Sequence, residues 1–283
     1  MMKKIIFLIL SFTISSFACD DGFVKNNHLQ IPPHSLLAGD MTEEQYKSTL
    51  KHFEKYFGQI VDSEHRAELQ IIISWSSNTV NAYAERDDDN WIITVYGGLA
   101  RHKAITVDGL NLVLCHELGH HLGGYPKKTT NRWSSAEGQA DYYGTMKCLR
   151  RLWEKEDNTS LVRSLSIPAL VKDQCAKAYS NENEKAICMR MALAGKSVAL
   201  MIQDLDHDSI EPKFETPDGL VVRSMNYMHP YAQCRLDTFF NGAICPVSET
   251  LEFDNDDETA GSCHAKNGDL RGLRPRCWFV PRK

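Results

Sequence analysis

The chain has 283 residues, of which 42% are hydrophobic and 24% are charged, a composition typical of a globular protein with a substantial core. This composition excludes wholesale disorder. The formal net charge is −5 and the basic residues are scattered along the chain. Both features argue against a nucleic-acid partner, because phosphate binding needs a clustered basic surface.

The N-terminus has the pattern of an export signal. Two lysines precede the apolar run 5–14, and small residues stand at positions −3 and −1 of a cleavage site after Ala18. The run is too short to span a membrane comfortably, and no later stretch reaches about 18 uninterrupted apolar residues. We therefore expect a signal peptide at 1–18 and an exported mature protein, periplasmic or secreted, without a transmembrane segment.

Nine cysteines fit an oxidising compartment, in which disulfides persist. Because nine is odd, at least one cysteine has no partner within the chain, and two interpretations stay open. Cys19 would directly follow the signal peptide and carry a lipid anchor, although the residues before it lack the leucine usual in lipoprotein signals. Alternatively, Cys115 would be a buried free thiol, since small buried cysteines are common.

A helix is predicted after the polar lead-in to the mature chain. Thr42 and Gln45 have the spacing of a capping box that starts a helix. Apolar residues then recur every three or four positions, as on a buried helix face that ends near 58–60. The predicted buried residues are Tyr46, Leu50, Phe53, Phe57 and Ile60.

Two β-rich apolar stretches, 69–75 and 91–96, are predicted to be strands of a small sheet. The polar residues 85–90 between them are expected to form a loop. Its acidic residues 87–89 are predicted to be a solvated loop tip, because they lack the spaced ligands and final glutamate of a calcium-binding loop.

The remaining chain is predicted to be mainly helical. The apolar stretch 100–124 contains one helix, and a second helix, capped by Ser134 or Ser135, runs towards Trp153. Residues 160–204 are expected to form two further helices. The cysteine-rich tail is predicted to be an irregular cap that is held by disulfides.

The motif with the clearest chemistry lies in the first of these helices. His116 and His120 are four residues apart, so on a helix both imidazoles face the same side and can bind one metal ion. Glu117 lies one position further round, where a carboxylate can act as the general base of a zinc hydrolase. The sequence therefore predicts a zinc site with two ligands and a base.

A catalytic zinc site needs a third protein ligand. Glu137 is the best candidate because it lies 17 residues after His120, at the start of the next predicted helix. Asp141 follows one turn later and can accept the second N–H of a ligating histidine. His121 points away from the ligand face, so we expect it to support a ligand or to lie at the surface.

Several stretches carry a family resemblance, in the same order along the chain. They are Asn-Ala-Tyr-Ala at 81–84, the segment 91–99 with its ending Tyr-Gly-Gly-Leu, the His-Glu-Leu-Gly-His motif at 116–120, Glu-Gly-Gln-Ala-Asp at 137–141, and His229-Pro230 with Arg235 and Leu236. Together they resemble the gluzincin peptidases of the CAAX prenyl endopeptidase and HtpX type. The resemblance implies that Glu137 is the third zinc ligand, with Asp141 as its supporting partner.

The same resemblance implies how a substrate is held. Asn81 and Ala82 would bind the substrate backbone as an added strand, and His229 and Arg235 would contact the substrate carbonyl and stabilise the oxyanion. The chain departs from the family in its lack of membrane helices, its short link between His120 and the third ligand, and its cysteine-rich tail. These differences argue against prenylated substrates, which need a membrane-embedded chamber.

We therefore expect an α+β fold of the zincin-like gluzincin type, mainly helical with a small β-sheet, in a single domain at 19–283. Its zinc core would comprise about 42–153 and 220–245, with a C-terminal cap at about 245–283. The predicted function is that of an endopeptidase with one Zn²⁺ per chain, which cleaves protein or peptide substrates of the cell envelope with Glu117 as base.

Two alternatives remain at this stage. The chain would be a periplasmic binding or chaperone-like module that keeps the zinc fold with little turnover, because the long cysteine-bearing segment 160–283 could cover the cleft. Either protein would also exist in a membrane-anchored form if Cys19 carries lipid.

Overall fold

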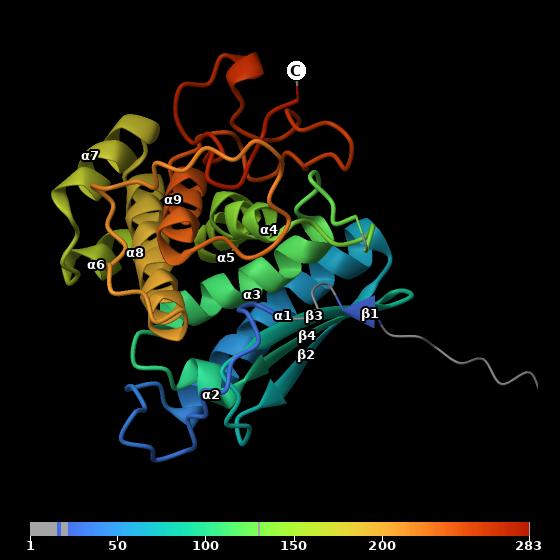
Figure 1. Ribbon diagram of the computed structural model, residues 1–283, viewed down its shortest axis with the longest axis vertical. Helices are drawn as coiled ribbons and strands as arrows, with labels where there is room; N and C mark the ends of the chain where they lie inside the picture. Colours follow the sequence, from blue (N-terminus) through green and yellow to red (C-terminus); the bar gives the residue numbers. More distant parts are fainter. Residues whose placement is uncertain (1–15, 18–21, 130, 283) are drawn as a thin grey trace, which may run out of the picture.

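A computed structural model of the chain describes residues 16–17, 22–129 and 131–282. The fold is α+β, as predicted, and its central element is helix α3, which lies between the sheet with α1 on one side and the remaining long helices on the other (Figure 1). The elements are β1 (Ser16–Phe17), α1 (Glu43–His65), β2 (Glu68–Ser74), β3 (Ala82–Asp87), β4 (Asn90–Tyr96), α2 (Gly97–Ala100), α3 (Val107–Leu122), α4 (Glu137–Tyr143), a π-helix (Gly144–Leu149), α5 (Arg150–Trp153), α6 (Asn158–Arg163), α7 (Ala169–Ala178), α8 (Glu182–Leu205), α9 (Ala232–Ala243) and a short 3-10 helix (Ala265–Asn267).

Helix α1 begins as its sequence predicts and ends later. The Thr42 side chain accepts a hydrogen bond from the Gln45 amide, and the Gln45 side chain bonds back to the Thr42 amide, which completes the capping box. The predicted end at 58–60 is wrong. The helix runs on to His65 because the buried stripe continues to Val61, whereas Gly58 faces open space and needs no turn there.

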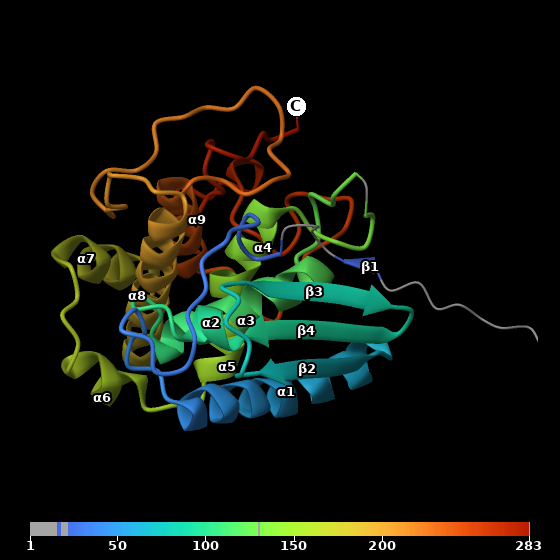
Figure 2. The same ribbon diagram turned by 60° about the horizontal axis from the view of Figure 1, so that its bottom comes forward.

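The sheet has the strand order β1-β3-β4-β2, in which β2 is parallel to β4 and β3 is antiparallel to β4 (Figure 2). The predicted loop at 85–90 is wrong, because β3 extends to Asp87 and only residues 88–89 form the turn. The charge of Arg86 is tolerated in the strand because its guanidinium stacks on two tryptophan rings, those of Trp91 and Trp133. The acidic turn is a loop tip, as predicted.

Helix α3 is buried on all sides, since every residue from Gly109 to Leu122 is buried. It contacts α4 closely at Gly119, where a Cβ atom would lie 2.8 Å from the carbonyl oxygen of Ala140. The predicted serine cap of α4 is wrong, because the capping residue is Ala136, which makes no side-chain hydrogen bond. The region predicted as two helices at 160–204 contains three, α6 to α8.

Helix α8 has the length and hydropathy of a membrane span, the only such helix among the described residues, but 72% of its most apolar stretch is buried inside the fold. It packs against α3 and α9. We therefore interpret it as a core helix.

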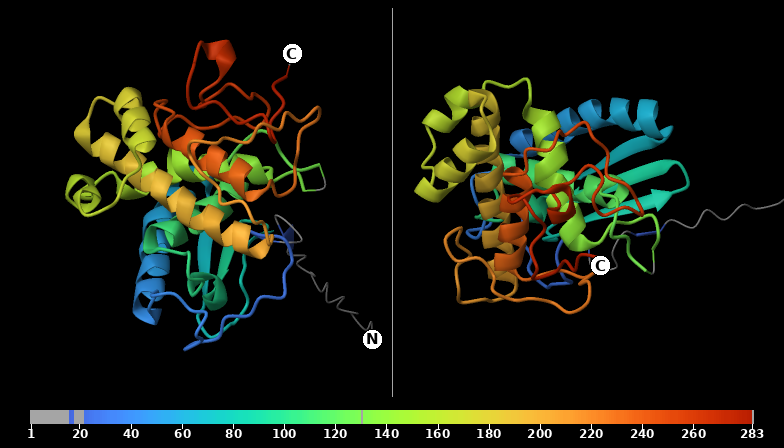
Figure 3. Two further views of the ribbon diagram at one scale, coloured as in Figure 1. Left: turned by 60° about the vertical axis from the view of Figure 1, so that its left-hand side comes forward. Right: turned by 90° about the horizontal axis from the view of Figure 1, so that it is seen from above.

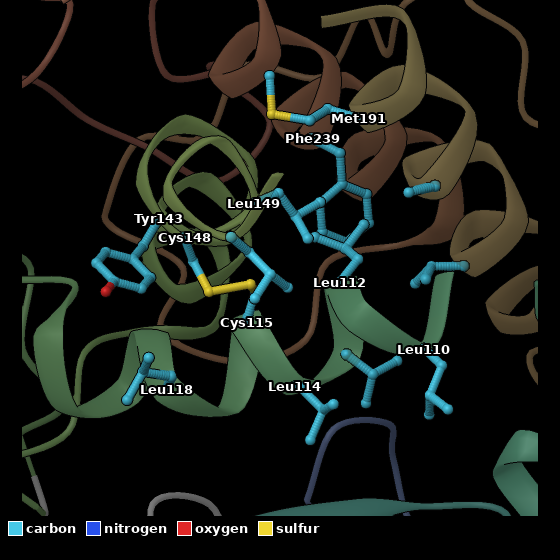
Figure 4. Packing of buried hydrophobic residues seen from close by; sticks show 14 of the residues in the cluster. Leu110, Leu112, Leu114, Cys115, Leu118, Tyr143, Cys148, Leu149, Met191 and Phe239 are labelled. Carbon is cyan, nitrogen blue, oxygen red and sulfur yellow. A yellow bond between two sulfur atoms is a disulfide. The ribbon is translucent and has the colours of Figure 1, made fainter. Parts of the chain in front are cut away.

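Eight of the nine cysteines pair in four disulfides, which suggests an oxidising environment. The Cys115–Cys148 bond joins α3 to the π-helix and is surrounded by apolar side chains (Figure 4). The interpretation of Cys115 as a free thiol is therefore wrong. Cys19, like most of the predicted signal peptide, lies outside the described residues.

The chain after α9 forms the predicted irregular cap. It lies on the side of the helical layer away from the sheet (Figure 3) and contains only the short 3-10 helix among its described residues. Disulfides Cys234–Cys277 and Cys245–Cys263 attach it to α9 and to the segment that follows.

The Cys115–Cys148 bond is expected to stabilise the fold. Replacing both cysteines by alanine should lower the free energy of unfolding by about 2–5 kcal/mol, because the bond restricts the unfolded chain and its loss opens space in the core. Urea denaturation measures the loss. The matched control replaces Cys175 and Cys188, which close a shorter loop of 13 rather than 33 residues, and an undiminished stability of the first variant would contradict the prediction.

Candidate metal centre

Three predicted ligands from two helices converge in the interior. His116 and His120 lie on α3, and Glu137 is the first residue of α4. The Glu137 carboxylate lies 3.3 Å from His116 Nε2 and 3.6 Å from His120 Nε2. Two ligand atoms bound about 2.1 Å from one tetrahedral ion are roughly 3.4 Å apart. The three side chains therefore have the separation of a metal-binding set.

The hydrogen bonds of the two histidines direct the same ring nitrogen towards the centre. His116 Nδ1 lies 2.7 Å from Asp141 Oδ1, and His120 Nδ1 lies 2.9 Å from the carbonyl oxygen of Ser135. Both oxygens are acceptors, so each Nδ1 carries the hydrogen and each Nε2 offers a lone pair. Asp141 thus makes the contact expected of it from the sequence.

These donor atoms fit a metal ion. His116, His120 and Glu137 are at most 1% exposed, and His116 Nε2, His120 Nε2 and Glu137 Oε2 make no hydrogen bond within the described part of the chain. Buried polar atoms are rarely left without partners. Two imidazoles and a carboxylate form the donor set of catalytic zinc sites of the His₂Glu type.

The Glu117 carboxylate is buried beside this set, and neither of its oxygens has a partner among the described residues. Burial raises the pKa of Glu117 to about 7, against the opposing charge of His116. A carboxyl with a pKa near neutrality can both accept and release a proton, which suits a general base.

Charges around the centre keep the third ligand ionised. Although burial opposes ionisation, His229 and the Lys128 ammonium lower the pKa of Glu137 well below its usual value, and Lys128 is the firmer cause because burial lowers the pKa of His229 itself. The Lys128 ammonium donates a hydrogen bond of 2.7 Å to Glu137 Oε1, which leaves Oε2 for a metal ion. Lys128 could not be predicted as part of the site, because it lies in a loop outside every motif.

Arg235 supports a residue of the metal centre in addition to contacting a backbone carbonyl. Its guanidinium is fully buried and makes a two-pronged ion pair with Asp141, with distances of 2.8 and 2.7 Å. Its third nitrogen, Nη1, donates to the carbonyl oxygen of Phe23 at 2.8 Å. Arg235 therefore both fixes Asp141 and contacts a backbone carbonyl.

The other predicted substrate-binding residues all contact the N-terminal segment of the same chain. The Ala82 carbonyl accepts from the Phe23 amide at 2.8 Å, and the Asn81 side chain bonds to both the amide and the carbonyl of Val24, each at 3.1 Å. His229 Nε2 donates to the carbonyl of Gly22 at 2.7 Å and lies 3.3 Å from Glu137 Oε2.

His121 is not at the surface, and that part of the prediction is wrong. Its ring is 6% exposed and stacks between Trp91 and Trp133, with centroids 4.7 Å from each. Arg86 Nη2 lies 3.3 Å from its Nδ1. The stack connects the loop before α4, which contains Trp133, to Trp91 on β4.

A cavity of about 560 Å³ lies beside this stack. Its basic lining residues are Arg86, Lys127, Lys128, Arg132 and Arg282. One of these residues, Lys128, also bonds to Glu137, so the basic lining of the cavity includes a partner of the third predicted ligand.

A second group of three potential ligands combines Asp218 with Cys234 and Cys277. Those two cysteines form a disulfide, so neither offers a thiolate. We therefore assign no metal to this group.

Comparison of the chain with known proteins identified no matching family, curated protein or solved structure. The assignment of a function therefore rests on the geometry of the site and on the motifs.

Asp141 is expected to be important for metal affinity. Asp141→Asn should weaken Zn²⁺ binding by about 10–100-fold, because the amide is a poorer acceptor for His116 and leaves Arg235 without its charge partner. Competition against a fluorescent chelator measures this change. Asp173→Asn, at an exposed position of α7, is the matched control, and equal affinities of the two variants would refute the role of Asp141.

Proposed function

We propose that this protein is an exported zinc metalloendopeptidase of the gluzincin type. The proposal rests above all on the convergence of His116, His120 and Glu137 with the adjacent Glu117, since all four side chains are buried and several of their polar atoms have no hydrogen-bond partner among the described residues. The order and spacing of the motifs give it independent support.

His116 and His120 would hold the zinc ion through Nε2, and Glu137 would hold it through Oε2. The chemistry that zinc supplies in such a site is Lewis acidity, which acidifies water and polarises a carbonyl group. Asp141 and the Ser135 carbonyl keep the two imidazoles in the required tautomer.

Glu117 would move the proton during hydrolysis. Its carboxylate accepts a proton from the attacking water and returns it to the nitrogen of the leaving amine. Glu117 is buried, which excludes bulk water from the proton transfers and favours the acceptance of a proton by its carboxylate.

The substrate backbone would lie along the start of β3, with its main-chain groups bonded to Asn81 and Ala82 as in strand addition. His229 Nε2–H would donate to the scissile carbonyl oxygen and stabilise the negative charge that develops there. Arg235 would bind the next carbonyl along the substrate, as it does with Phe23.

A second candidate function is a binding or chaperone-like module with little turnover. It is favoured by the burial of the metal set together with residues 22–24, which lie against the groups that would bind a substrate. The intact Glu117 argues against it, because a site without turnover has no use for a base. Hydrolysis of casein that stops with a chelator and returns with zinc would exclude this function.

We further propose that the protein acts in the periplasm or outside the cell, in keeping with its four disulfides. A lipid on Cys19 would anchor it to a membrane. Mass spectrometry of the mature N-terminus distinguishes the anchored form from the free form.

The role of Glu117 gives a direct test of the proposed function. Glu117→Gln should lower peptide hydrolysis at least about 100-fold, because the amide cannot accept the proton, while the zinc content stays near one per chain. Hydrolysis of a peptide library and metal analysis measure the two quantities. Glu154→Gln in the loop after α5 is the control, and a Glu117→Gln variant as active as the unaltered protein would show that the assignment is wrong.

A further inference from the structure

The segment Gly22–Val24 contacts every group that the proposed function assigns to the substrate backbone. The Phe23 amide donates to Ala82, Val24 exchanges two hydrogen bonds with the side chain of Asn81, and the carbonyls of Gly22 and Phe23 accept from His229 and Arg235 (distances given above). Figure 2 shows this blue segment passing the start of β3. Five hydrogen bonds therefore hold three consecutive residues against the groups that would bind a substrate backbone.

The register of these bonds identifies one peptide bond. His229 Nε2 lies 2.7 Å from the Gly22 oxygen and 3.3 Å from Glu137 Oε2, so the Gly22 carbonyl and a predicted metal ligand lie near the same imidazole nitrogen. The Phe23 amide, on the other side of the same peptide bond, is held by Ala82. Gly22–Phe23 is thus the peptide bond whose carbonyl contacts His229, as the proposed mechanism requires of the bond to be cleaved.

The side chain of Phe23 fills the space beside this bond. It is fully buried, its ring packs edge-on against the ring of His116 at 4.7 Å, and the Arg235 guanidinium lies 4.4 Å from its centroid. A pocket formed by an imidazole edge and a stacked guanidinium suits a large apolar or aromatic side chain.

A glycine is required before this bond. Gly22 has a φ of +80°, and a Cβ atom there would lie 2.4 Å from the Ala82 carbonyl oxygen and 2.9 Å from Asn81 Oδ1. The backbone therefore passes this edge of β3 too closely for any side chain in that conformation.

We infer that Gly22–Val24 lies in the cleft as a substrate would, with Gly22–Phe23 at the position of the scissile bond, and that this segment must leave before another peptide enters. The inference rests on the proposed function, because only that function makes these contacts a substrate-binding site. It assigns to the site peptides with a glycine before the cleaved bond and a large apolar residue after it. The chain is then its own competitor for the site, and its activity depends on how readily the segment is displaced.

The binding test uses the labelled peptide acetyl-Gly-Phe-Val-Lys-Asn-Asn, which has the sequence of residues 22–27, and zinc-loaded protein with Glu117→Gln to prevent turnover. Adding Gly22→Ala should tighten binding at least tenfold, because the segment no longer fits. Gly268→Ala is the matched control, since Gly268 also has a positive φ but no atom near its Cβ position, and it should change nothing. Equal affinity with and without Gly22→Ala would overturn the inference.

The pocket is tested with a second peptide in which the phenylalanine is replaced by alanine. It should bind at least tenfold more weakly to the Gly22→Ala protein. Equal binding of the two peptides would contradict the assigned substrate class.

A further measurement keeps Gly22 unaltered, so its result does not depend on whether the Gly22→Ala variant folds correctly. Hydrogen exchange at the Phe23 and Val24 amides should accelerate when saturating peptide is added, because these amides lose their partners Ala82 and Asn81. Peptide binding that leaves both amides protected would overturn the inference, even if the protein cleaves peptides. Binding that exposes them, without cleavage of any peptide by the protein with intact Glu117, would instead refute the proposed peptidase function.

Discussion

The ion pair between Arg235 and Asp141 connects the three helices that build the metal centre. Arg235 comes from α9, Asp141 from α4 and the next partner, His116, from α3. All three side chains are completely buried, so the carboxylate would carry a costly unpaired charge without the guanidinium. The pair is therefore both a condition for packing these helices together and the means by which the tautomer of His116 is set.

This arrangement explains why one arginine serves two purposes. Two of its nitrogens bind Asp141, and the third donates to the backbone carbonyl of Phe23. Because the guanidinium is planar and rigid, fixing its inner edge also fixes the direction of its outer donor. A lysine at 235 would satisfy neither geometry in full.

The chemistry of the site was more predictable from the sequence than its surroundings. His116, His120, Glu137 and Asp141 lie on helices, and helical spacing determines which side chains share a face. These residues indeed form one cluster. By contrast, Lys128 and the Trp91–His121–Trp133 stack join segments through loop conformation, which no periodic pattern encodes.

The errors in the predicted elements have a similar cause. The charge of Arg86 favoured the prediction of a loop. In the structure its guanidinium is stabilised by two tryptophan rings, one on β4 and one in a loop 47 residues later in the chain. Gly58 suggested a helix end because glycine commonly follows the last helical residue. The sequence does not reveal that Gly58 lies in open space within the helix. Gly22–Val24 contacts β3, α9 and the loop that precedes α9. These contacts depend on the tertiary fold, so local composition cannot predict them.

The disulfide next to the first histidine has a consequence for the order of assembly. Cys115 directly precedes His116, and Cys148 lies in the π-helix that continues the helix of Glu137. The two sulfur atoms can bond only when the two ligand-bearing helices pack against each other. Formation of the disulfide therefore requires the helix arrangement that also brings the ligands together. The bond is fully buried, so soluble thiols have little access to it, and it holds the two ligand-bearing helices together covalently.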